Sequence, residues 1–180
     1  MEEAGLFAAD RLDHSHTFIR PHLASGSIVI SDRNIHSSLI YQGVVGDLGL
    51  NNVASMNAAA MIPDLVFWID CDPSKAMKRI KSGTLRMTSQ KQEYFETQEI
   101  QTAIRRGFHD LFASTSQVPA PFNQCCVVGP IMNEGGLDDL KTKLRRELRR
   151  FFNKKPLPLN VDRDEVDRLS LIHISEPTRQ

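Results

Sequence analysis

The stretch PDLVFWIDCDPSKAMKRI, residues 63–80, carries the clearest pattern in the chain. The apolar run from Leu65 to Ile69 predicts a short buried strand. Asp72 stands directly before Pro73, and this order predicts a helix that begins at Pro73 with Asp72 as its N-cap. A buried strand followed at once by a helix is the building unit of an α/β fold with a parallel sheet.

The same alternation continues on both sides of this stretch. Two more short strands are predicted, at residues 27–31 and 124–128. Helices are predicted around them at residues 2–23, 37–45, 51–61, 95–112 and 137–152. Residues 82–93 show no apolar periodicity and are predicted to form a mobile polar loop. The fold class that follows is α/β, with a parallel β-sheet flanked by helices.

The composition limits the classes of function. The chain has 180 residues, of which 41% are hydrophobic and 24% charged, enough for one domain with a core. Its 22 basic and 22 acidic residues cancel, which argues against a nucleic-acid or membrane partner. No apolar run approaches the ~18 residues that indicate a transmembrane helix. Three cysteines without metal-ligand spacing favour a reduced, cytoplasmic protein.

Polar residues follow the strand predicted at residues 27–31. Ligands of open α/β sheets bind beyond the carboxyl ends of the strands, which is where Asp32 and Arg33 stand. A guanidinium suits bidentate phosphate binding, and a carboxylate suits a metal held through water. A structural ion pair would explain the same two residues equally well. More polar side chains follow in the next segment: Ser37, Tyr41 and Gln42.

A second candidate lies in the first helix. Phe7 and Arg11 are four residues apart and therefore share one helix face. An aromatic ring beside a guanidinium can stack on a nucleobase and hydrogen-bond its carbonyl edge. Spacing alone favours the simpler alternative, a core phenylalanine next to a surface arginine.

The polar loop gives a third group of candidates. Arg79 and Arg86 are cations near residues 82–93, and such a loop can close over phosphates and neutralise charge that develops during transfer. A solvated helix end is the more common explanation of a cluster like this. Glu96 and Gln101 follow the loop, and taken alone they indicate only a helix start and a surface amide.

The end of the chain departs from the pattern. Residues 153–168 are predicted to be a polar tail. Residues 169–180 contain LSLIHISEPTR, which matches the translation of a transposon-end adapter used to prepare sequencing libraries. We therefore divide the chain into a domain at residues 1–152, a polar tail at 153–168 and an adapter-derived artefact at 169–180.

Four segments, taken in order, resemble the thymidylate kinases of archaea and bacteria. They are LFAADR at residues 6–11, VISDRNIHSSLIYQG at 29–43, PDLVFWIDCDPSKAMKRI at 63–80 and FETQEIQTAIRRGF at 95–108. The resemblance covers roughly residues 3–152 and implies a P-loop nucleoside monophosphate kinase-like fold. It also implies an enzyme that phosphorylates dTMP to dTDP with ATP and Mg²⁺, and it allows a homodimer.

The resemblance implies roles around the nucleoside. Phe7 would stack on the thymine ring, and Arg11 would bond its exocyclic oxygen. Tyr41 would lie under the sugar, where a 2′-hydroxyl would clash, so that deoxyribose is favoured. Two further side chains would complete the wall around the nucleoside: Ser37 and Gln42.

Other residues match phosphate and metal positions of the family. Arg33 would hold the dTMP phosphate, and Asp32 would lie near the magnesium ion. Glu96 and Gln101 match positions on the lid side that touch the phosphate or sugar, and Glu96 is a second metal candidate. The lid cations would be Arg79 and Arg86.

One expected motif is missing from the chain. No G-x-x-x-x-G-K-[ST] loop occurs, although the family holds the donor phosphates with it, upstream of the LFAADR segment. We therefore expect an incomplete domain, without its first strand and P-loop, that is poorly soluble and inactive alone although its parent is active. The alternatives are another P-loop deoxynucleoside or nucleotide kinase, and a non-catalytic nucleotide-binding or interaction remnant.

Overall fold

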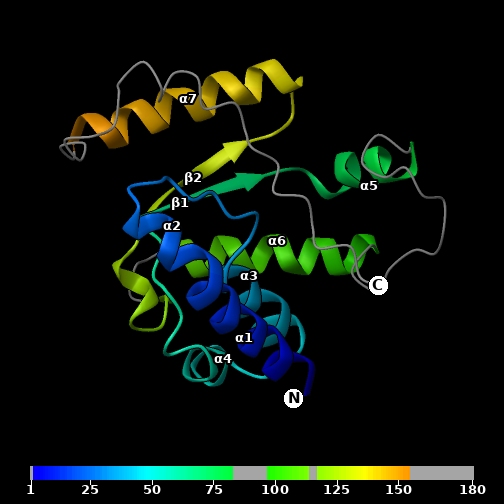
Figure 1. Ribbon diagram of the computed structural model, residues 1–180. Coiled ribbons are helices and arrows are strands. Elements are labelled where there is room, and N and C mark those ends of the chain that lie inside the picture. Colours follow the sequence, from blue (N-terminus) through cyan, green and yellow to red (C-terminus); the bar gives the residue numbers. More distant parts are fainter. Residues whose placement is uncertain (1, 83–96, 114–116, 155–180) are drawn as a thin grey trace.

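The computed structural model describes residues 2–82, 97–113 and 117–154 (Figure 1). Its α-helices are α1 (Glu2–His14), α2 (Arg20–Ala24), α3 (Ile35–Ser38), α4 (Leu50–Met56), α5 (Pro73–Lys81), α6 (Gln98–Phe112) and α7 (Leu137–Lys154). Two π-helical segments, η1 (Ser15–Ile19) and η2 (Leu39–Val45), and a 3₁₀ turn, η5 (Phe122–Gln124), lie between them. The strands are β1 (Leu65–Asp70) and β2 (Cys126–Met132).

The two strands of the described residues pair in parallel. Leu65 lies opposite Cys126 at one end and Asp70 opposite Met132 at the other, with a register shift between Phe67 and Ile69. In Figure 1, α7 lies on one side of the strands and α6 on the other. The predicted architecture, a parallel sheet flanked by helices, is therefore confirmed.

The prediction of a strand at residues 27–31 is wrong. This segment has no strand conformation, and no described segment pairs with it. Ile28 and Ile30 are each 41% exposed, which is not the burial expected for a central strand. An apolar, β-branched sequence favours a strand, but the strand forms only where a neighbour satisfies its backbone N–H and C=O groups.

Several predicted boundaries move by a few residues. The strand predicted at 124–128 begins at Cys126, because Phe122–Gln124 form a 3₁₀ turn. The helix predicted at 51–61 ends at Met56, and α6 begins after Thr97, whose side chain accepts a hydrogen bond from the Ile100 N–H. The long first helix is confirmed as the consecutive segments α1, η1 and α2.

The predicted start of α5 is confirmed. The Asp72 Oδ1 accepts hydrogen bonds from the backbone N–H of Ser74 at 2.9 Å and of Lys75 at 3.3 Å. These bonds satisfy two of the donors that a helix N-terminus leaves unpaired. The carboxyl end of β1 is thereby joined directly to a helix, as the sequence predicts.

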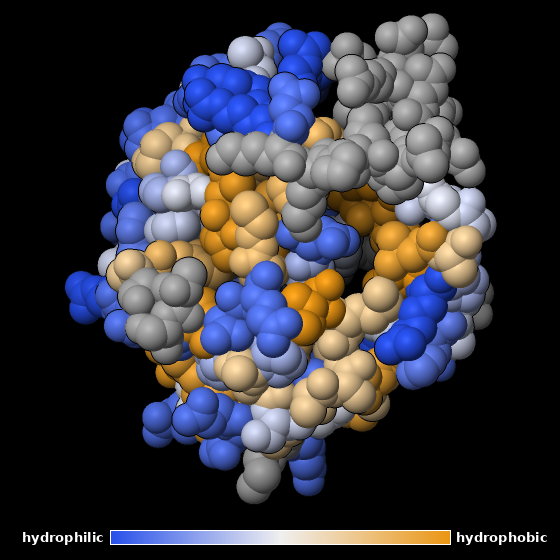
Figure 2. Space-filling model, turned by 90° about the vertical axis from the view of Figure 1, so that its left-hand side faces the viewer, coloured by the Kyte–Doolittle hydropathy of each residue, from blue (hydrophilic) through white to orange (hydrophobic). Residues whose placement is uncertain are grey.

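The core lies among α3, η2, α4 and α6. Ile35, Leu39, Ile40 and Phe122 are fully buried there. Figure 2 shows that apolar areas also reach one face of the molecule. Ile69, on β1, is 44% exposed. None of the helices in the described part of the chain has both the length and the apolar character needed to cross a bilayer.

Candidate functional site

Arg11 lies at the junction of three helices. Its Nη2 donates a hydrogen bond to the Ser38 Oγ of α3 at 2.7 Å, and its Nη1 donates to the Asn57 Oδ1 just after α4. Burial lowers the pKa of Arg11, although the nearby Asp10 carboxylate opposes this shift. The guanidinium is thus held by two neutral acceptors, and its charge stays available to an electron-rich group of a ligand.

Phe7 stands one helical turn before Arg11 on α1. Phe7 is 40% exposed, so the residue is open to solvent and does not belong to the core. The simpler alternative from the sequence, a core phenylalanine with a surface arginine, therefore does not describe this pair. The aromatic residue is the exposed one and the cation is the half-buried one.

Arg33 and Tyr41 come together at the start of η2. The Arg33 Cζ lies 5.1 Å from the centroid of the Tyr41 ring, a cation–π distance. The Arg33 backbone is left-handed, with a φ of 68°, and its carbonyl accepts a hydrogen bond from the Ser31 Oγ at 2.7 Å. Asn34 then caps α3 through its Oδ1 and the Ile35 N–H. This turn places an exposed cation over an aromatic ring, with Asp32 beside it in the chain and also exposed.

Other predicted residues lie on the same elements. Ser37 on α3 and Gln42 on η2 are half-buried, close in sequence to Tyr41. Gln101 is half-buried on α6, which packs against η2. Arg86 and Glu96 lie outside the described residues.

Arg79 is engaged elsewhere. Its Nη1 donates to the Asn133 carbonyl at 3.1 Å and contacts the Cys71 Sγ at 3.6 Å, while its Nη2 donates to the Gly135 carbonyl at 3.3 Å. These contacts fasten α5 to the segment that follows β2. They do not join Arg79 to Arg33 or Tyr41.

A charged cluster at the carboxyl end of β1 was not predicted. The Asp70 carboxylate is 3% exposed and accepts two hydrogen bonds of 2.8 Å from Arg105, one on each oxygen. The His109 Nε2 lies 3.2 Å from its Oδ2. The Trp68 ring meets the His109 ring edge-on, with 4.6 Å between centroids. The sequence does carry one signal of this cluster, since Asp70 directly follows the apolar run of a predicted strand, as Asp32 follows the strand predicted at residues 27–31.

The cluster shifts the pKa of Asp70 and of Arg105. Burial alone would raise the pKa of Asp70, but the hydrogen bonds from Arg105 and His109 outweigh it, and the pKa lies below its ordinary value. The same hydrogen bond to Asp70 raises the pKa of Arg105. Asp70 is therefore a buried carboxylate that stays ionised because α6 supplies its partners.

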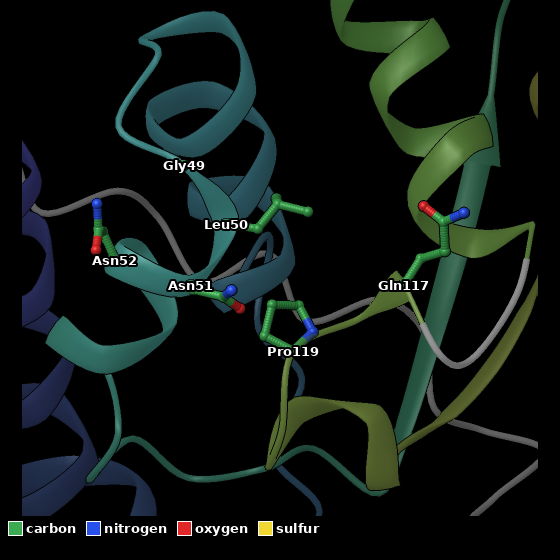
Figure 3. Close-up of a pocket in the computed structure, with 6 residues that line it drawn as sticks. All are labelled: Gly49, Leu50, Asn51, Asn52, Gln117 and Pro119. Atoms are coloured by element: carbon green, nitrogen blue, oxygen red, sulfur yellow. The ribbon is translucent and has the colours of Figure 1, made fainter.

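An open hollow of 640 Å³ lies away from these residues. It is lined by Gly49, Leu50, Asn51, Asn52, Gln117 and Pro119. Figure 3 shows Leu50 and Asn51 on one side of it and Gln117 on the other. None of the candidate residues lines it, so we do not assign the nucleotide to this hollow.

The described residues contain no group of three or more His, Cys, Asp or Glu side chains placed to hold a metal ion. Asp32 is the one predicted metal residue that falls within the described ranges. A single exposed carboxylate beside a cation suits Mg²⁺ when a phosphate is present, because Mg²⁺ keeps several waters and takes phosphate oxygens as further ligands.

Comparison with known proteins gives one consistent answer. The family model described as thymidylate kinase matches residues 1–119. The chain is 42% identical over 106 residues to a probable thymidylate kinase of Thermococcus onnurineus, covering 59% of this chain and 49% of that protein. It is 36% identical over 118 residues to the thymidylate kinase of Mycoplasma pneumoniae, covering 62% and 53% of the two chains.

The chain spans about half the length of the curated relatives it matches. The matched region includes the segment from α1 to α6, on which the described candidate residues lie. It therefore contains all the described geometry around Arg11, Arg33 and Asp70. By the extent of the family match, the chain belongs to the thymidylate kinase family.

Proposed function

We propose that this chain forms the dTMP-binding part of an enzyme that transfers the γ-phosphoryl group of ATP to dTMP, giving dTDP. The observation that carries the proposal is the pair of Arg33 and Tyr41, with 5.1 Å between guanidinium carbon and ring centroid. A cation for the 5′-phosphate and a flat ring for the sugar are thereby adjacent, as a nucleoside monophosphate needs.

The base would bind beside α1. In this proposal the exposed Phe7 ring stacks on thymine, and Arg11 donates to an exocyclic oxygen of the base. Arg11 is already oriented by Ser38 and Asn57, which reduces the entropy lost when the base binds. Ser37 and Gln42 would contact the nucleoside from α3 and η2.

The phosphate and its metal would lie at the turn before α3. Arg33 would hold the dTMP phosphate in a bidentate manner, and Asp32 would hold Mg²⁺ through water. When bound, Mg²⁺ neutralises charge on the transferring phosphoryl group. Glu96, Gln101, Arg79 and Arg86 remain candidates for contacts from the lid side.

ATP would need groups that this chain lacks. The sequence has no glycine-rich loop ending in Lys-Ser or Lys-Thr, the motif that holds the donor phosphates in P-loop kinases. In our proposal that loop belongs to the part of the enzyme outside this chain. The chain then binds dTMP but does not turn over ATP, and the whole enzyme is cytoplasmic.

Equilibrium dialysis with labelled dTMP tests the proposal. The full 180-residue chain would be fused to a soluble partner protein, and the partner alone would serve as the blank. We expect saturable binding of dTMP that exceeds binding of dAMP, and an Arg33→Gln variant should bind on the order of tenfold more weakly, because a charge-assisted phosphate contact is lost.

The matched control is Arg145→Gln on α7, which removes another exposed arginine from a helix outside the site. This variant should bind dTMP as the unsubstituted chain does. Equal losses in the two arginine variants, or no binding of dTMP, would contradict the proposal. Turnover of ATP by the 180-residue chain would contradict the assignment of the donor loop to sequence outside it.

A further inference from the structure

We propose that Asp70 is a positioning residue for the dTMP site. It fixes α6 against the end of β1, and α6 in turn fixes η2 and the Tyr41 ring. This inference rests on the proposed function, because it concerns the same site. It goes beyond that proposal by assigning a role to a cluster that touches no proposed substrate atom.

Asp70 is closed to a ligand. Its side chain is 3% exposed, and both carboxylate oxygens are engaged by Arg105 at 2.8 Å. The Oδ2 also lies 3.2 Å from the His109 Nε2. A group enclosed in this way cannot act on substrate directly, so any effect on the site must pass through its partners.

Both partners belong to α6 and stand four residues apart. They therefore lie on one helix face, one turn from each other. Attachment at two points along a helix fixes both its rotation and its position along its axis. The fork of Arg105 adds direction to this attachment, since its Nε and Nη2 reach different oxygens of the carboxylate.

The opposite contact of α6 is with η2. A Cβ placed on Gly107 would lie 3.2 Å from the Ile40 Cγ2 and 3.7 Å from the Val44 Cγ1, so the side chains of η2 pack directly against the α6 backbone at Gly107. Ile40 is fully buried and directly precedes Tyr41. A rotation of α6 would therefore displace the residue next to Tyr41, because the packed core leaves no space to absorb it.

Discrimination between dTMP and 5-methyluridine monophosphate is the decisive measurement. These ligands differ only at the 2′-hydroxyl, which our proposal places against Tyr41. A variant that merely lowers the folded fraction weakens the binding of both ligands by the same factor and leaves the ratio of their dissociation constants unchanged. A variant that displaces Tyr41 changes the ratio.

The experiment compares Asp70→Asn, Arg105→Lys and the control Glu147→Gln in the full chain, by equilibrium dialysis with both nucleotides. We expect Asp70→Asn to weaken the binding of dTMP on the order of tenfold and to reduce the preference for dTMP over 5-methyluridine monophosphate. Arg105→Lys keeps the charge but loses the fork, so it should give the same change of preference at smaller size. Glu147 likewise accepts from two arginines, on α7, and its variant should behave as the unsubstituted chain.

The outcomes separate the two proposals. If the unsubstituted chain binds neither nucleotide, the proposed function fails and this inference fails with it. If the chain prefers dTMP and Asp70→Asn keeps that preference while folded, as judged by circular dichroism, only the inference is overturned. If Asp70→Asn does not fold, the preference measured with Arg105→Lys decides in the same way.

Discussion

The guanidinium of Arg11 and the hydroxyl of Ser38 are joined by a hydrogen bond of 2.7 Å that connects α1 to α3. The same guanidinium reaches Asn57, which is 1% exposed. Asn57 in turn donates from its Nδ2 to the Val53 carbonyl of α4 at 2.8 Å. One cation therefore ties together three segments that are far apart in the sequence, and we propose that this cation also meets the base.

Replacing Arg11 by lysine tests the structural part of this arrangement. A lysine ammonium is a point charge without the planar fork, so it cannot serve both Ser38 and Asn57 in the same geometry. We expect a loss of about 1–3 kcal/mol in the free energy of unfolding, measured by urea denaturation. The exposed Arg20→Lys is the control and should change stability by less than about 0.5 kcal/mol. Equal stabilities of the two variants would contradict the assignment.

His36 should make the fold sensitive to mild acid. The side chain is 4% exposed, between the Cys125 Sγ at 3.4 Å and the Phe112 ring at 5.7 Å. Burial lowers the pKa of His36, although a backbone hydrogen bond at Phe122 opposes the shift. In the unfolded chain His36 binds a proton near pH 6.5, whereas in the folded chain it stays neutral at that pH.

The expected effect has a definite sign. Above pH about 6.5 the titration of His36 does not change the free energy of unfolding. As the pH is lowered from there, the free energy of unfolding decreases, with a slope of up to about 1.4 kcal/mol per pH unit, until the lowered folded-state pKa is reached. His36→Gln should flatten this part of the curve of unfolding free energy against pH. The exposed His22→Gln keeps His36 and should leave the fall in place. A curve that is the same in all three chains would show that His36 does not cause it.

The parts of the fold that could be predicted are those fixed by neighbours in the sequence. The strand β1, the cap by Asp72 and the helix α6 each depend on residues within a few positions of one another. The strand expected at residues 27–31 failed because strand formation depends on a partner, which the local pattern does not contain.

The candidate site, too, could be predicted only where it depends on residues close together in the sequence. The spacing of Phe7 and Arg11 and the Asp-Arg turn before α3 are visible as short motifs. The partners of Arg11 and of Asp70 lie 27 to 46 residues away in sequence, and hydrogen bonds over such separations are set by packing. A strand that ends in an acidic residue is a weak signal that could have marked Asp70, but it does not identify Arg105.

Gly129 should tolerate no side chain. A Cβ at this position would lie 2.6 Å from the Trp68 carbonyl oxygen and 2.8 Å from the Trp68 Cβ, on the strand paired with β2. Backbone of a paired strand cannot yield as a side-chain tip can, so Gly129→Ala should destabilise the fold by about 2 kcal/mol or more. Gly136→Ala is the control, because nothing lies within 4 Å of its added methyl group. Thermal unfolding followed by circular dichroism would compare them, and similar midpoints would contradict the close approach of the two strands.

Asp70 should stabilise the fold only while it is ionised. Its pKa is held below the ordinary value, so the folded state binds the proton more weakly than the unfolded state does. The contribution is fully present above pH about 4, the ordinary range of aspartate, and is lost as the pH falls through the folded-state pKa. At pH 5, Asp70→Asn should lower the free energy of unfolding by about 2 kcal/mol, since a buried partner of Arg105 loses its charge.

That difference should shrink when the unfolding free energies of both chains are followed from pH 5 to pH 2.5 by urea denaturation. Asp138→Asn on α7 removes a carboxylate whose side chain is 100% exposed and should give no comparable difference at any pH. If Asp70→Asn and Asp138→Asn change the free energy of unfolding equally at pH 5, the ion pair of Asp70 with Arg105 does not stabilise the fold. If the difference at pH 5 is found and disappears in acid, the attachment of α6 to β1 depends on the ionised carboxylate, as its hydrogen bonds with Arg105 require.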